Sequence, residues 1–130
     1  MPTLALQQQV EQAVEILRNG GVVAFPTDTL YGLGGLITEP KAINRIFDIK
    51  GRAASSPLPV LLSDARELDH VVPQAGPLAR KLAQEFWPGS LTLVLAKPSW
   101  ISNVVTGNLD TIGLRIPSHW VPRALISALG

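Results

Sequence analysis

Hydrophobic positions recur along the chain with two different spacings. The spacing typical of one helical face predicts helices over 6–17, 39–49 and 77–86. Short apolar runs bounded by proline or glycine predict strands over 22–25, 58–62, 91–95 and 112–116. Asp64 and Glu67 are spaced as in a capping box and predict a short helix over 63–68, and Ser118 opens a last helix. Helices and strands therefore interleave, which predicts one layered α/β domain.

Composition agrees with a globular domain. The chain has 130 residues, of which 46% are apolar and 16% are charged, a balance typical of a folded chain. No linker divides it, so we expect one domain over 1–130. The absence of cysteine excludes disulfides and thiolate-bound zinc. No secretory signal is visible, and apolar runs such as 91–96 are too short to span a bilayer, so we expect a cytoplasmic protein without membrane contact.

Basic residues gather in one stretch of the chain. The net charge of +1 gives no argument for nucleic-acid binding. Lys41, Arg45, Lys50 and Arg52 nevertheless fall close together, opposed there only by Asp48. On charge alone, the favoured interpretation is a solvated helix face followed by a loop.

Several familiar chemistries are missing from the sequence. His70 and His119 stand in no metal-ligand spacing and are interpreted as ordinary surface or capping residues. The chain has no Gly-x-Ser-x-Gly elbow, no Walker A motif and no Gly-x-Gly-x-x-Gly fingerprint. A nucleotide would have to be held in some other way.

Three polar segments could build a site, and each also has a structural interpretation. Segment 26–34 follows a strand and carries hydroxyls, a carboxylate and a phenol, but Thr, Asp and Gly are also ordinary turn formers. In segment 50–58, Lys50 and Arg52 could hold a polyphosphate or complement a helix dipole. Arg115 interrupts an apolar strand and needs a route to solvent or an anionic partner, either a protein carboxylate or a substrate carboxylate.

Together these segments resemble the YrdC-like threonylcarbamoyl-AMP synthase family over essentially the whole chain. The family's motifs occur here in order: Pro-Thr-(Asp/Glu)-Thr-x-Tyr-Gly-Leu at 26–33, Lys-x-Arg at 50–52 followed by Pro-Leu at 57–58, Trp-Pro-Gly-x-x-Thr at 87–92, and Arg-x-Pro at 115–117. One such motif would be weak evidence, whereas four in order are specific.

The resemblance implies a fold and a reaction. The fold is a three-layer α/β domain around a twisted mixed sheet with a concave, positively charged face. The reaction joins L-threonine, bicarbonate and ATP into L-threonylcarbamoyl-AMP and pyrophosphate. A separate complex then transfers the threonylcarbamoyl group to an adenosine of tRNA. Magnesium would arrive with ATP and needs no dedicated protein ligands.

The resemblance also assigns residues. It implies that Thr29, Tyr31 and Arg115 hold threonine, with Arg115 on the carboxylate. It implies that ATP is held by Lys50, Arg52, Ser56 and Thr111. No catalytic nucleophile and no metal ligand are expected, because adenylyl transfer depends mainly on positioning and charge stabilisation. We expect Thr29, Lys50, Arg52 and Arg115 to line one cleft.

The chain departs from the family pattern at two places. The family's Ser-x-Asn motif follows the segment that matches 124–130, so the resemblance implies a YrdC-like domain whose C-terminal part is missing here. Leu61 stands where some relatives carry a histidine near threonine. Two other hypotheses stay open: a tRNA or double-stranded RNA binding module that uses the basic stretch, and a carbamoyl-transfer paralogue of the same fold.

Overall fold

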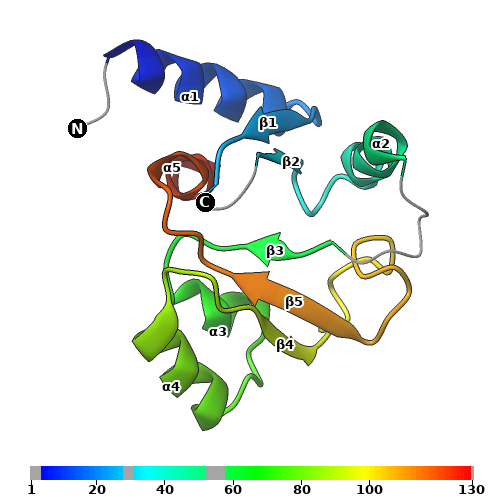
Figure 1. Cartoon of the computed structure of the whole chain (residues 1–130). Coiled ribbons are helices and arrows are strands. Elements are labelled where there is room, and N and C mark those ends of the chain that lie inside the picture. The colour runs from blue at the N-terminus through cyan, green and yellow to red at the C-terminus, as the bar shows by residue number, and fades with distance from the viewer. Residues whose placement is uncertain (1–3, 28–30, 52–57, 130) are drawn as a thin grey trace.

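The computed structural model describes residues 4–27, 31–51 and 58–129. Helices and strands interleave along these residues, as the hydrophobic spacing predicts (Figure 1). The element order is α1 (Leu4–Arg18), β1 (Val23–Phe25), β2 (Gly32–Gly34), α2 (Pro40–Lys50), β3 (Val60–Leu61), α3 (Glu67–Val71), α4 (Pro77–Phe86), β4 (Leu93–Ala96), β5 (Thr111–Arg115) and α5 (Trp120–Leu129). None of the described helices is both long and apolar enough to cross a membrane.

The described strands form two sheets. β1 and β2 make an antiparallel hairpin in which Val23 pairs with Gly34 and Phe25 with Gly32. β5 is the middle strand of the second sheet, parallel to β3 and antiparallel to β4. The second sheet is therefore mixed, which confirms that prediction. In Figure 1 the hairpin lies above the three-stranded sheet, with α5 to one side.

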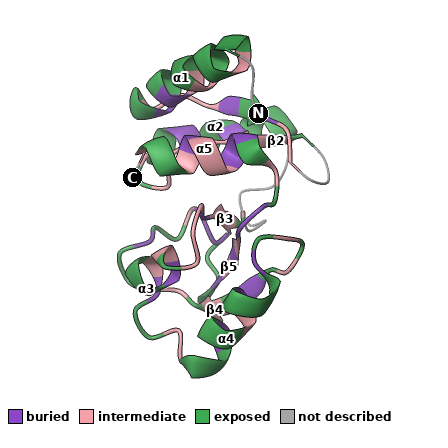
Figure 2. Cartoon of the chain, turned by 90° about the vertical axis from the view of Figure 1, so that its left-hand side faces the viewer, coloured by how far each residue is buried: buried purple, intermediate pink, exposed green. Residues whose placement is uncertain are grey.

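Buried side chains divide into two clusters (Figure 2). The hairpin cluster joins α1, β1 and α5 and consists of Val14, Leu17, Val23, Phe25, Val121 and Leu125. The sheet cluster is larger and joins α2, α3 and α4 to the three-stranded sheet and its connections. It consists of Ile43, Phe47, Leu62, Leu68, Val72, Ala79, Ala83, Trp87, Leu93, Ile101, Val105, Ile112, Leu114 and Ile116.

Strand β2 lies inside the segment for which the sequence predicts only a turn-rich loop. Two of its three residues are glycines, so it lacks the apolar alternation that marks a strand. The reason for one glycine is steric, because a Cβ on Gly34 would lie 2.6 Å from Cε1 of the buried Phe25 ring. The hairpin thus needs a residue without a side chain where Phe25 covers β2.

Two other predicted elements are shorter or later than expected. The strand predicted over 58–62 pairs only at Val60–Leu61. The short helix begins at Glu67 because residues 64–66 form a turn in which Glu67 N–H donates to the Asp64 carbonyl at 3.0 Å. At the last helix, Val121 N–H donates to His119 Nδ1 at 3.1 Å, so His119 is a capping residue, as interpreted.

Candidate functional site

A cavity of about 470 Å³ lies between the hairpin and the three-stranded sheet. Its walls include residues of β1, β2, α2, β3 and α5 and are mainly apolar, for example Phe25, Ile46, Val60 and Leu125. Among the described residues, polar side chains also line it, including those of Thr27, Tyr31, Lys50, Glu67 and Arg115. The polar part of the wall is the candidate site.

Arg115 is the last residue of β5 and is half-buried. Its Nε donates a hydrogen bond of 2.7 Å to the carbonyl of Gly89, and Gly89 N–H donates at 2.8 Å to the carbonyl of Ile116. The sequence interpretation asked for an anionic partner or a route to solvent, whereas the Gly89 carbonyl that accepts from Nε is neutral. The two bonds fix the guanidinium at the end of the strand.

The turn that supplies Gly89 is itself anchored. Trp87 is buried in the sheet cluster, and its Nε1 donates to the carbonyl of Leu91 at 2.8 Å. A methyl of Thr92 packs beside Gly113, where a Cβ would lie 3.4 Å from it. The Trp-Pro-Gly-x-x-Thr segment therefore supports β5 and positions Arg115.

Tyr31 and Thr27 come from the hairpin. Thr27 follows β1 and is half-buried, whereas Tyr31 immediately precedes β2 and its ring is 79% exposed at the cavity. Thr29, which the resemblance assigns to threonine binding, lies between them, outside the described residues. Of the three residues expected to hold threonine, Tyr31 and Arg115 thus line one cavity.

Lys50 is exposed at the cavity, at the last position of α2. Gly51 ends the helix in the left-handed conformation, with φ +65, and its N–H points to the carbonyls of Asp48 and Phe47. Arg52 and Ser56 lie outside the described residues. Of the four residues expected to share a cleft, Lys50 and Arg115 line the same cavity, and Thr29 and Arg52 fall in the undescribed segments.

Thr111 lies at the opposite end of β5 from Arg115. It is exposed, it pairs with Ala96 of β4, and it is not among the described residues that line the cavity. The structure therefore brings Tyr31, Lys50 and Arg115 together and places Thr111 apart from them.

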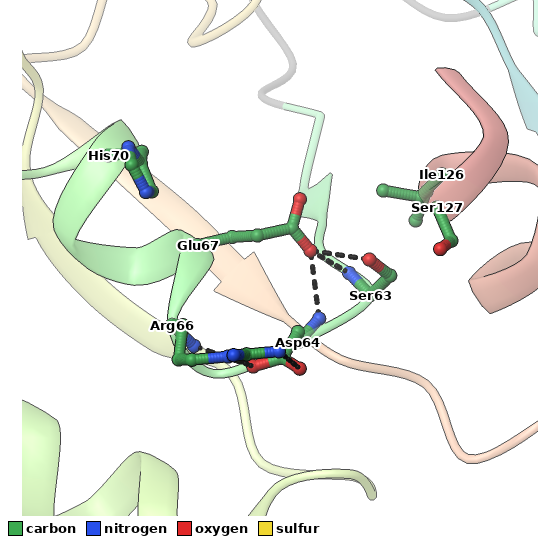
Figure 3. Close-up of a pocket in the computed structure, with 7 residues that line it drawn as sticks. All are labelled: Ser63, Asp64, Arg66, Glu67, His70, Ile126 and Ser127. Carbon is green, nitrogen blue, oxygen red and sulfur yellow. Dashed lines mark hydrogen bonds and ion pairs between the residues drawn. The ribbon is translucent and has the colours of Figure 1, made fainter. Parts of the chain in front are cut away.

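A second cavity of about 390 Å³ adjoins the first, with which it shares Glu67 and Ile126. Figure 3 shows its lining residues, which are Ser63, Asp64, Arg66, Glu67, His70, Ile126 and Ser127. Glu67 was predicted from the sequence only as a capping residue. Its place in both cavities is a functional signal that the sequence spacing does not carry.

The two charged neighbours of Glu67 form their own pair. Arg66 Nη2 lies 3.0 Å from Asp64 Oδ2, and the Arg66 backbone N–H donates to Asp64 Oδ1 at 2.9 Å. The side-chain hydrogen bond from Arg66 lowers the pKa of Asp64 below its ordinary value. Asp64 and Arg66 therefore close the turn that precedes α3. The described residues contain no group of three or more His, Asp or Glu side chains that could hold a metal ion.

Known proteins resemble this chain in sequence and in structure. A family model of the Sua5/YciO/YrdC type, described as telomere recombination, matches residues 15–130. The threonylcarbamoyl-AMP synthase of Pyrococcus abyssi (strain GE5 / Orsay) is 41% identical over 118 residues, or 91% of this chain and 35% of that protein. That of Bacillus subtilis (strain 168) is 42% identical over 123 residues, or 94% of this chain and 36% of that protein.

Solved structures show the same likeness. The structure of P. abyssi Sua5 complexed with L-threonine has a TM-score of 0.88 at 40% identity, covering 93% of this chain and 36% of that one. The structure of E. coli YciO has a TM-score of 0.84 at 33% identity, covering 95% of this chain and 60% of that one. These likenesses confirm the α/β fold that the resemblance implies.

The chain spans about a third of the length of the two synthases. The family match nevertheless covers residues 15–130 and thus takes in both sheets and every residue of the candidate site. The chain belongs to the Sua5/YciO/YrdC family.

Proposed function

We propose that the protein makes L-threonylcarbamoyl-AMP from L-threonine, bicarbonate and ATP, for the threonylcarbamoyladenosine modification of tRNA. The observation that carries the proposal is the fixed guanidinium of Arg115 in the same cavity as Lys50. A guanidinium matches a carboxylate bidentately, and an ammonium suits a phosphate as a point charge. A relative with L-threonine bound has the same fold.

The reaction needs positioning more than covalent chemistry by the protein. The α-ammonium of threonine first loses a proton, and the free amine then forms a bond to the carbon of bicarbonate, which gives a carbamate and water. A carbamate oxygen then attacks the α-phosphorus of ATP, and pyrophosphate leaves. Arg115 holds the threonine carboxylate, with Tyr31 and Thr29 beside it, and Lys50, Arg52 and Ser56 hold ATP. Fixed cations stabilise the charge that develops at the phosphates.

Magnesium enters with ATP in this proposal and needs no dedicated protein ligands. The product is a mixed anhydride, which is an activated form of the threonylcarbamoyl group, so a separate transfer complex passes the group to tRNA. We also propose that the protein acts in the cytoplasm.

Pyrophosphate release tests the proposed function. The intact protein should release pyrophosphate only when threonine, bicarbonate and ATP are all present. Lys50→Ala and Arg52→Ala should each lower kcat/KM by at least tenfold, because each removes a charged partner of the phosphates, worth about 1.5–3 kcal/mol. Lys81→Ala, on an exposed position of α4, is the matched control and should leave the rate unchanged.

Two other results would replace the proposal. Pyrophosphate release that needs no threonine would favour a carbamoyl-transfer paralogue with another acceptor. Salt-sensitive tRNA binding without any pyrophosphate release would favour the RNA-binding module, because Lys41, Arg45 and Lys50 are all exposed on α2 and offer mainly phosphate contacts.

A further inference from the structure

Glu67 is a cavity-lining carboxylate that the protein fixes at one oxygen. Its Oε1 accepts hydrogen bonds from Ser63 N–H at 2.7 Å, from Asp64 N–H at 2.8 Å and from the Ser63 hydroxyl. Figure 3 shows the side chain reaching from α3 to these three donors. The position of the carboxylate is therefore set by the backbone that leaves β3.

The second oxygen of Glu67 is directed elsewhere. In Figure 3 it points away from the three donors. Within residues 4–27, 31–51 and 58–129, no hydrogen bond or ion pair engages it. A carboxylate oxygen accepts hydrogen bonds, so a cationic N–H donor in the cavity would complement it.

Glu67 and Arg115 both lie near the carboxyl ends of two paired strands, β3 and β5. β3 and β5 run parallel, and Leu62 N–H donates to the carbonyl of Arg115 at 2.9 Å. Ser63, which holds the Glu67 carboxylate, is the next residue along the chain. Both charged side chains line the same cavity, and the carboxyl ends of strands in α/β sheets are common ligand sites.

A cation and an anion on one cavity wall match a zwitterion. Arg115 complements a carboxylate, and the open oxygen of Glu67 complements an ammonium group, which carries three N–H donors. We propose that Glu67 binds the α-ammonium group of the amino acid substrate. The proposal rests on the proposed function, in which Arg115 binds the carboxylate of the same molecule. Glu67 would thus select free amino acids over N-acylated or deaminated analogues.

The substitution Glu67→Gln separates this role from capping. Glutamine at this position still accepts the backbone N–H bonds of a capping box, so the fold should be retained while the charge is lost. Calorimetry on the intact protein should show threonine affinity weakened about tenfold to a hundredfold, the usual effect of losing a charged hydrogen-bond partner. ATP affinity should stay unchanged. Glu85→Gln, exposed on α4, is the matched control.

A second measurement compares two ligands. The wild-type protein should bind N-acetyl-L-threonine, which keeps the carboxylate and hydroxyl but has a neutral amide, at least tenfold more weakly than threonine. In Glu67→Gln this discrimination should shrink, a change that a purely structural role of Glu67 would not produce. Steric exclusion alone would leave the discrimination equal in both proteins and would overturn the proposal.

The outcomes separate the inference from the proposed function. Equal threonine affinity in the wild type and in a folded Glu67→Gln variant would show that Glu67 does not bind the ammonium, and the proposed function would stand. Tight wild-type binding of N-acetyl-L-threonine would exclude ammonium recognition by Glu67 even if the variant failed to fold. Absence of any threonine binding by the wild-type protein would instead remove the proposed function itself.

Discussion

An arginine inside an apolar strand is the residue on which the site depends. Arg115 alternates with the fully buried Ile112 and Leu114 and lies on the other face of β5. The Gly89 carbonyl accepts from its Nε and so fixes the direction of the guanidinium. A side chain fixed in this way loses little rotamer freedom when it binds a carboxylate.

Replacing Arg115 tests that role directly. Arg115→Ala should weaken threonine binding about tenfold to a hundredfold, because a charged hydrogen-bond partner is lost, and should change ATP binding much less. Arg115→Lys should recover only part of the affinity, since an ammonium cannot reproduce the bidentate fork. Calorimetric titrations with each ligand measure both effects. Unchanged threonine affinity in Arg115→Ala would remove this residue from the site.

Sequence spacing identified some site residues better than others. Arg115 was recognisable because a charge in an apolar strand needs a partner. Lys50 was assigned only through the resemblance, because a cation at a helix end can equally complement the helix dipole. Glu67 was not recognisable, because a capping glutamate and a ligand-binding glutamate have the same sequence signature. Thr111 and Arg115 share a face of β5 by the two-residue period, but four residues of strand separate them by about 13 Å. Motif order alone does not show that separation.

At the scale of elements, the end of α2 determines how Lys50 meets the cavity. Pro40 begins this helix, and Ala42, Ile43, Ile46 and Phe47 bury one face of it. Gly51 then ends it with φ +65. A Cβ on Gly51 would meet nothing within 4 Å, so glycine is needed there for its backbone conformation and not for lack of space.

Gly51→Ala should therefore act through the backbone alone. We expect a loss of about 1 kcal/mol in the free energy of unfolding, measured by denaturant titration, because alanine disfavours the left-handed conformation. ATP affinity should also fall, since the direction of the chain between Lys50 and Arg52 changes.

The control for this substitution is Gly76→Ala. Gly76 has φ +90, its added Cβ would also meet nothing within 4 Å, and it caps α4 away from the cavity. It should lower stability at least as much, because its φ 90 and ψ 164 are essentially restricted to glycine, and it should leave ATP affinity intact. A loss of ATP affinity in both variants would mean that general destabilisation, and not the Lys50 geometry, is responsible.

The elements that the sequence predicted well are those with a long periodic face. α1, α2 and α4 carry apolar residues at helical spacing over ten or more residues, and their positions were predicted to within a few residues. β2 was missed because its glycines carry no pattern, and β3 was overestimated because an apolar run continues beyond its two paired residues. Short strands depend on their partners, which a single sequence does not reveal.

At the scale of the whole molecule, the cavity separates two cores of unequal size. The hairpin cluster has six buried residues and the sheet cluster fourteen. α1 is tied to α5 by a bond of 2.8 Å from Arg18 Nη2 to the carbonyl of Ala128. The cavity wall takes Leu17 and Leu125 from the hairpin cluster and Ile43 and Leu62 from the sheet cluster. A bound ligand would therefore contact both cores.

The two cores should open with different free energies. Local unfolding is easier where few apolar side chains are buried. The free energy of the opening that lets backbone amides of α1 and β1 exchange with solvent should therefore be at least about 1 kcal/mol lower than that for β5.

Leu125→Ala creates a cavity in the smaller core, which should lower the free energy of unfolding by about 2–5 kcal/mol. It should speed exchange in α1, β1 and α5 while leaving β5 nearly unchanged, because Leu125 packs in the hairpin cluster only. Leu114→Ala, at a fully buried position of β5, should instead speed exchange throughout the sheet cluster. Native-state hydrogen exchange of both variants measures this. If Leu125→Ala lowered the protection of β5 as much as that of β1, the two clusters would be one cooperative unit, and the cavity would not divide them.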